Sequence, residues 1–189
     1  MKELLRSASH ACLALTLFGC ALAAGTPAVA PSATSGVKWA SDTEPAWTEL
    51  QRALTGRWKA TTPQNRTIVV SYRVVSNGSA LVETFTSASG KETISVYHRD
   101  GGGLMLTHYC AQGNQARLKA IEATRGRIVF AYLDATNVGG EQDVMTRLAL
   151  VLRADGFDQE TVYRAPSGEQ ETTTLRFFSA DDPPLIPVR

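Results

Sequence analysis

Residues 67–109 read TIVVSYRVVSNGSALVETFTSASGKETISVYHRDGGGLMLTHY. Branched and aromatic side chains alternate with polar ones, and the alternation is interrupted at Asn77-Gly78, Ser89-Gly90 and Asp100-Gly101. A period of two is typical of strands that bury one face, and glycine after Asn or Asp favours a tight hairpin turn. The stretch therefore predicts four consecutive antiparallel strands.

The pattern continues on both sides of this stretch. A helix is predicted before it, with Asp42 or Thr43 as the cap, Pro45 in the first turn, and an end at Gly56. Strands are predicted near 57–61, 67–75, 80–87, 91–99, 104–110, 116–124, 127–133, 145–154, 159–165 and 170–178. A meander this long must roll up to avoid bare edges. The predicted fold is all-β, an antiparallel up-and-down barrel of about ten strands with one short N-terminal helix.

Counting residues across the turns assigns faces to the strands, because directly opposed residues share a face. Two-residue turns at Asn77-Gly78 and Ser89-Gly90, with a four-residue turn at Asp100-Gly101, predict an inner face of Ile68, Val70, Tyr72, Val74, Leu81, Glu83, Phe85, Ile94, Val96, His98, Met105, Thr107 and Tyr109. His108 and Cys110 then point outward, unless a β-bulge reverses the register. The same counting near the C-terminus groups Leu148, Leu150, Leu152, Thr161, Tyr163, Thr172, Thr174 and Arg176, and leaves residues 116–133 undecided.

Polar side chains on an otherwise apolar inner face are the candidate site. A carboxylate there is costly unless it is paired. Such groups either form a structural network or orient a ligand in a small barrel. The candidate ligand-binding residues are Tyr72, Glu83, His98, Thr107, Tyr109 and Tyr163, with His108, Asn114 and Gln115 at a possible pocket mouth.

The segment LTGRWKA resembles the G-x-W motif that opens the first strand of lipocalins and other calycins, and Gly56 and Trp58 match it. The resemblance implies that an arginine from the last strand, here Arg176, covers the tryptophan. Similarity to nitrobindin-like calycins implies a possible haem ligand, for which His98 is the predicted interior histidine. The run YHRDGGGLMLTHYCAQGNQ also resembles a group of uncharacterised bacterial exported barrel domains.

The two ends of the chain carry separate signals. Residues 1–23 resemble an export signal, with a positive start and a short apolar core. Cleavage fits either a lipobox, with Cys20 lipidated, or the A-x-A site at Ala21 to Ala23. Residues 24–40 have linker composition, 41–179 form the predicted barrel domain, and 180–189 are a proline-rich tail. We expect a periplasmic protein or an outer-membrane lipoprotein, with membrane contact only through the possible anchor.

Composition restricts the remaining functions. The formal charge is +1, and no basic run exists, which argues against nucleic-acid binding. Cys12 and Cys20 lie in the signal, so Cys110 is the one cysteine of the predicted domain and has no C-x-x-C partner. No metal site is predicted.

Four functions fit these patterns. The first is non-enzymatic binding of a small apolar or amphipathic ligand in the barrel lumen. The second is haem binding through His98. The third is a hydrolase or isomerase with Glu83 as base beside His98, although no catalytic motif supports it. The fourth is a structural envelope lipoprotein whose barrel is filled.

If Cys20 is acylated, radiolabelled palmitate is incorporated into the protein in its native bacterium, and Cys20→Ala abolishes the incorporation. Gel autoradiography of the purified protein reads this out. Absence of label in the unmodified chain would favour cleavage at the A-x-A site.

Overall fold

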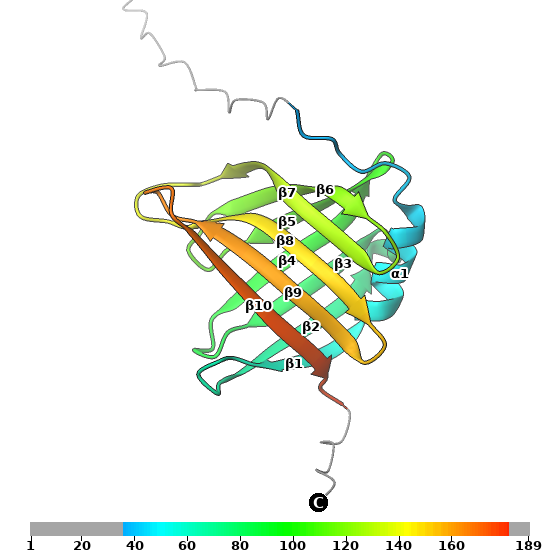
Figure 1. Ribbon diagram of the computed structural model, residues 1–189, viewed down its shortest axis with the longest axis horizontal. Coiled ribbons are helices and arrows are strands. Elements are labelled where there is room, and N and C mark those ends of the chain that lie inside the picture. The colour runs from blue at the N-terminus through cyan, green and yellow to red at the C-terminus, as the bar shows by residue number, and fades with distance from the viewer. Residues whose placement is uncertain (1–35, 182–189) are drawn as a thin grey trace, which may run out of the picture. The chain divides into compact units, whose positions relative to one another are not determined.

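The computed structural model describes residues 36–181, which form a closed ring of ten antiparallel strands with one helix at its end (Figure 1). The predicted fold class is confirmed. The predicted signal peptide, Cys20 and most of the predicted tail lie outside the described residues. In order the elements are α1 (Glu44–Leu54), β1 (Gly56–Thr61), β2 (Thr67–Val75), a 3-10 turn (Ser76–Gly78), β3 (Ala80–Thr86), β4 (Glu92–Asp100), β5 (Gly103–Tyr109), β6 (Gln115–Ala123), β7 (Arg127–Thr136), β8 (Val144–Arg153), β9 (Gly156–Arg164) and β10 (Gln170–Ser179).

Each strand pairs with its neighbours in sequence, and β10 pairs with β1 to close the ring. The predicted strands coincide with the observed ones to within a few residues; the largest differences are that β9 begins at Gly156 rather than 159 and that β7 ends at Thr136 rather than 133. Gly156 itself has φ +149, and a Cβ there would lie 2.0 Å from the carbonyl oxygen of Phe177. Only glycine therefore fits where β9 starts against β10.

Helix α1 closes one end of the barrel (Figure 1). Its apolar face buries Ala46, Trp47, Leu50 and Leu54. The side chain of Gln51 donates to the carbonyl of Gly78 at 2.8 Å, and the backbone of Thr43 donates to that of Gly102 at 3.1 Å. These bonds tie the helix to the β2–β3 and β4–β5 turns, so α1 covers the end of the barrel at which those turns lie.

Aromatic rings fill the lumen next to the helix. Phe157 stacks on Phe177 at a centroid distance of 4.9 Å, and Trp58 meets Phe157 edge-on at 5.3 Å. Tyr72 and Tyr97 extend the cluster from β2 and β4. The indole nitrogen of Trp58 donates to the carbonyl of Leu54 at 2.6 Å. This end of the barrel is a packed core, and its edge-to-face geometry is the one that aromatic pairs prefer.

The predicted role of Arg176 as a cover for Trp58 is wrong. Arg176 lies on the outer face of β10, opposite Asp158, and its guanidinium bonds Asp158 at 3.0 Å and Asp155. It stacks over the ring of Phe178 at 5.1 Å. The inner positions of this part of β10 are Leu175 and Phe177, which are buried.

A one-residue error in the predicted register also places about half of the predicted inner face on the outside of the barrel. The predicted pairs across Asn77-Gly78 are confirmed, including Tyr72 with Glu83. Phe85, however, pairs with Thr93 rather than Ile94, so β4 is shifted by one residue. The β4–β5 register then follows the prediction, with His98 opposite Met105, and β5 inherits the reversal. His108 therefore points inward, while Ile94, Val96, His98, Thr107 and Tyr109 point outward.

The cause is the loop type. At Ser87–Lys91 the amide of Gly90 donates to the carbonyl of Ser87, and the amide of Ser87 donates to the carbonyl of Lys91. Gly90 has φ +80. This is a type I turn followed by a left-handed residue, which places three residues in the loop instead of two. The loop at Ala165–Glu169 has the same bonds, and it moves Thr172, Thr174 and Arg176 to the outer face.

Two bulges explain why residues 116–133 could not be assigned. The β6–β7 register shifts between Arg117 and Leu118 and again between Ala120 and Glu122. Ala116, Leu118, Ala120 and Phe130 are buried, whereas Arg117 pairs outside with Asp134. Simple alternation fails across bulges because each one adds an unpaired residue.

Phe177→Ala should lower the free energy of unfolding by about 3–5 kcal/mol, because it removes a fully buried ring from the aromatic cluster. The matched control is Phe178→Ala on the outer face, where 45% of the side chain is exposed. Its cost should be about 1 kcal/mol or less. Urea unfolding of both variants measures the difference. Equal losses would contradict the assignment of faces on β10.

Candidate ligand-binding cavity

A cavity of about 380 Å³ occupies the end of the lumen opposite α1. It lies below hairpin loops that share one conformation, at Thr62–Arg66, Ser87–Lys91, Cys110–Asn114 and Ala165–Glu169. Each loop has a residue with positive φ at its fourth position. The volume of the cavity suits a small organic molecule. The barrel is thus filled at the helix end and hollow at the loop end.

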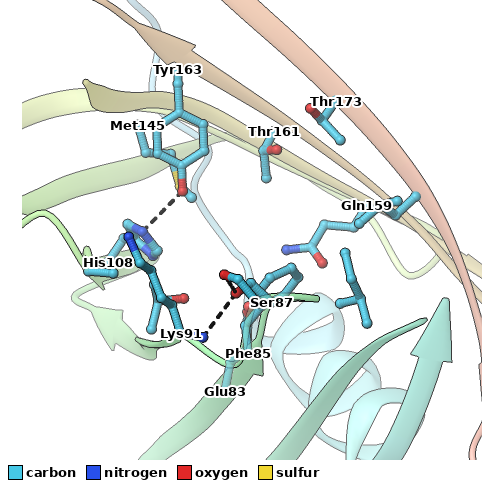
Figure 2. A pocket seen from close by; sticks show the side chains of 15 residues that line it. Glu83, Phe85, Ser87, Lys91, His108, Met145, Gln159, Thr161, Tyr163 and Thr173 are labelled. Atoms are coloured by element: carbon cyan, nitrogen blue, oxygen red, sulfur yellow. Dashed lines mark hydrogen bonds between the residues drawn. The ribbon is translucent and has the colours of Figure 1, made fainter. Parts of the chain in front are cut away.

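Most of the surface that lines the cavity is apolar, and polar side chains project into the cavity from several strands (Figure 2). Ile68, Phe85, Met145 and Leu175 supply the apolar surface from β2, β3, β8 and β10. The polar and hydroxyl side chains among the lining residues are Glu83, Ser87, Ser89, Lys91, Thr93, His108, Gln159, Thr161, Tyr163 and Thr173.

Glu83 lies at the floor of the cavity, where the cavity meets the aromatic cluster. Only 3% of the residue is exposed, and the hydroxyl of Tyr97 donates to its carboxylate. Burial raises the pKa of Glu83, and the hydrogen bond from Tyr97 opposes that shift. Burial, together with the Glu83 charge, raises the pKa of Tyr97, so this hydroxyl stays protonated as a donor.

Gln159 faces Glu83 across the floor from β9. It is 4% exposed, and Figure 2 shows its amide extending from the strand into the cavity. Its amide oxygen has no hydrogen-bond partner among the described residues, and neither has the hydroxyl of Tyr72. A buried acceptor left without a donor costs about 1–3 kcal/mol. The floor therefore has unused hydrogen-bonding capacity.

His108 forms a second polar group on the wall. Its Nδ1 lies 3.1 Å from the hydroxyl of Ser95, and its Nε2 lies 3.1 Å from the hydroxyl of Tyr163, as the dashed line in Figure 2 marks. Burial lowers the pKa of His108 to about 4, so the ring is neutral near pH 7. A neutral imidazole accepts one of these bonds and donates the other. Both nitrogens are thus occupied.

Of the predicted ligand-binding residues, the structure brings Glu83 and Tyr163 to the cavity and buries Tyr72 just below it. His98, Thr107 and Tyr109 lie on the outer face, because β4 and β5 are reversed. His98 is half-buried on the outer face, and its Nδ1 lies 2.9 Å from the carbonyl of Arg99. It cannot reach a lumenal haem or act beside Glu83 as a catalytic pair.

The predicted mouth residues divide in a similar way. His108 lines the cavity itself. Asn114 is buried and donates to the carbonyl of Asp143 at 3.0 Å. Gln115 accepts from Thr136 and Asn137 and donates to Gly113. These two amides brace the mouth loops and are absent from the lining. Cys110 is half-buried beside Tyr163 and Glu171 at the mouth.

Counting from turns missed Tyr97, Ser95, Gln159 and Thr173. A signal for them does exist in the sequence. Ser-Gly is a weaker two-residue turn than Asn-Gly, and glycine is favoured at the fourth position of a type I turn. Reading Ser87 to Gly90 and Ala165 to Gly168 as such turns places Ser95, Tyr97 and Thr173 inside, whereas Gln159 already shares a face with Thr161 on the predicted inner side.

The sequence matches no protein-family model and no curated protein. Within residues 36–181 no group of three or more His, Cys, Asp or Glu side chains could hold a metal ion. In the same range no helix is long and apolar enough to cross a membrane. The cavity is therefore the feature of the described residues that bears on function.

The burial of His108 can be tested through the pH dependence of stability. His108 keeps its pKa near 4 in the folded state and regains about 6.5 on unfolding, so the unfolded state binds more protons between these values. Its contribution to stability is complete above about pH 6.5 and is lost as the pH falls toward 4. Between about pH 7 and about pH 4.5 this loss is on the order of 2.5 kcal/mol.

His108→Gln should reduce the acid-induced loss of stability by that amount. Urea unfolding at the two pH values measures the loss for each protein. Carboxylates that titrate in this range are common to both proteins and cancel in the comparison. Identical acid losses in the His108→Gln and unmodified proteins would contradict a buried neutral His108.

Proposed function

We propose that this barrel is a calycin-like binding protein that holds a small, mainly apolar molecule in its lumen without chemical change. The observation that carries the proposal is the cavity of about 380 Å³, open at the loop end and lined by apolar walls with a few converging polar groups. Its volume equals that of roughly a dozen water molecules. Expelling such water from apolar walls favours an apolar occupant.

The geometry supports binding over catalysis. Ser95, which bonds His108, is 1% exposed and does not line the cavity. The other ring nitrogen of His108 meets a tyrosine rather than a carboxylate. A serine nucleophile needs both access to substrate and a base oriented by a third group. Neither condition is met by these residues.

The same contacts disfavour haem as the occupant. The single histidine on the lumenal side of the described barrel is His108, and both of its nitrogens are engaged. Axial ligation would require breaking one of these buried bonds. A barrel filled throughout as a structural element is disfavoured by the cavity, although its helix end is filled.

The proposed setting is outside the cytoplasm, in the periplasm or at the outer membrane. Support comes from the signal-like residues 1–23 and the linker composition that follows. A tethered or free barrel there would meet small apolar molecules in the envelope.

Filling the lumen should abolish binding. Thr161 lines the cavity from β9, whereas Thr174 lies on the outer face of β10, beside the outward-facing Glu160. Thr161→Trp should weaken binding of the uncharged fluorescent probe phenylnaphthylamine at least about tenfold, because the indole takes its space. Thr174→Trp should bind the probe as the unmodified protein does.

Fluorescence titration of the three proteins measures the dissociation constants. Mass spectrometry of small molecules retained on purification identifies a natural occupant. Equal affinities of the two tryptophan variants would show that the probe binds elsewhere and would overturn the lumenal site.

A further inference from the structure

We propose that the lumenal ligand carries a protonated amine, seated at the cavity floor between the carboxylate of Glu83 and the amide of Gln159. The inference rests on the proposed binding function and names the chemistry of its ligand. It depends on the polar groups of the floor, the charges around the mouth and the apolar walls between them.

The floor presents acceptors. The Glu83 carboxylate has two oxygens with about four acceptor positions, and one hydroxyl, that of Tyr97, donates to it. The amide oxygen of Gln159 is buried and without a partner among the described residues. An ammonium group has three donors and no acceptor. It matches the floor in both charge and hydrogen bonding.

A neutral or anionic head group fits the floor less well. A hydroxyl group has one proton, so it can satisfy a single acceptor, and it brings no positive charge to stabilise the ionised form of Glu83 against burial. A carboxylate would bring a second negative charge beside Glu83 in a poorly solvated site, where repulsion is strong. The floor therefore selects by charge as well as by shape.

The mouth of the cavity, like its floor, carries mainly negatively charged side chains. Tyr163 joins the cavity to the surface depressions at its mouth, which are lined by Asp143, Glu169 and Glu171. Lys91 is the single Lys or Arg residue among the lining residues of these three regions. A mouth with this balance attracts cations and raises their local concentration near the cavity.

The walls define the rest of the ligand. Between mouth and floor lie Ile68, Phe85, Met145 and Leu175. Thr93, Thr161 and Thr173 add hydroxyl groups to the same walls, but most of the lining surface is apolar, so the body attached to the amine is mainly apolar. The ligand class is therefore an alkyl or aryl amine small enough for a cavity of about 380 Å³.

The test compares hexylamine, hexanol and hexanoate, which share one chain and differ in the head group. Isothermal titration calorimetry on the full folded barrel, near neutral pH and at low salt, measures each affinity. Hexylamine should bind at least about tenfold more tightly than hexanol, the difference between a charged and a neutral hydrogen bond, and hexanoate should bind most weakly.

Glu83→Gln should remove the preference for the amine, because it keeps an acceptor for Tyr97 but has no charge. The matched control is Glu160→Gln on the outer face of β9, where Glu160 pairs with Arg147 at 3.2 Å. This control should retain the preference. If Glu83→Gln does not fold, Gln159→Met removes the free acceptor instead and should weaken hexylamine binding more than hexanol binding.

The outcomes separate this inference from the binding function itself. Equal or reversed affinities for the amine and the alcohol, with normal phenylnaphthylamine binding in the lumen, would refute the amine and leave the binding function standing. A preference for hexylamine that survives both Glu83→Gln and Gln159→Met would place the amine elsewhere and refute the site. Failure of the Thr161→Trp test would refute both proposals.

Discussion

The hydrogen bond from the amide of Gly90 to the carbonyl of Ser87 decides which side chains line the lumen. It closes a type I turn and places Gly90 in the left-handed region, so the hairpin loop has three residues. Strand β4 then enters the sheet with Ser95 and Tyr97 inside rather than Val96 and His98. Since side chains alternate with period two, this single choice carries through the next hairpin and brings His108 into the barrel.

The fold was predictable because it depends on the number of strands and turns. The residues of the site depend in addition on which face of its strand each side chain occupies. Alternation and Gly-containing turns were enough to predict ten strands and the helix before Gly56. Glu83 was placed correctly because one Asn-Gly turn separates it from Tyr72. His98 and His108 were exchanged because a one-residue error in one loop reverses every later side chain until another irregularity intervenes. The inner-face prediction for Arg176 was wrong for the same reason, at the second Ser-Gly loop.

The lumen has two halves with different physical roles. Next to α1 the rings of Trp58, Phe157 and Phe177 pack against one another and fill the lumen. Toward the loops the side chains become smaller and more polar, and a cavity remains. Glu83 lies at the boundary, where Tyr97 reaches it from the packed half. A ligand group bound there would contact a rigid surface, which favours selectivity because little ordering is left to occur on binding.

A short stretch of pairing between β1 and β10 closes the ring. β1 and β10 share two Cα partner pairs, Trp58 with Ser179 and Lys59 with Phe178, plus the bond from Ala180 to Arg57. The rest of β10 is paired with β9 alone in the described barrel, and Ile68 and Leu175, from either side of this seam, line the same cavity. Local opening costs least where the fewest hydrogen bonds break. The β1–β10 seam is therefore the part of the barrel wall that opens at the lowest free-energy cost.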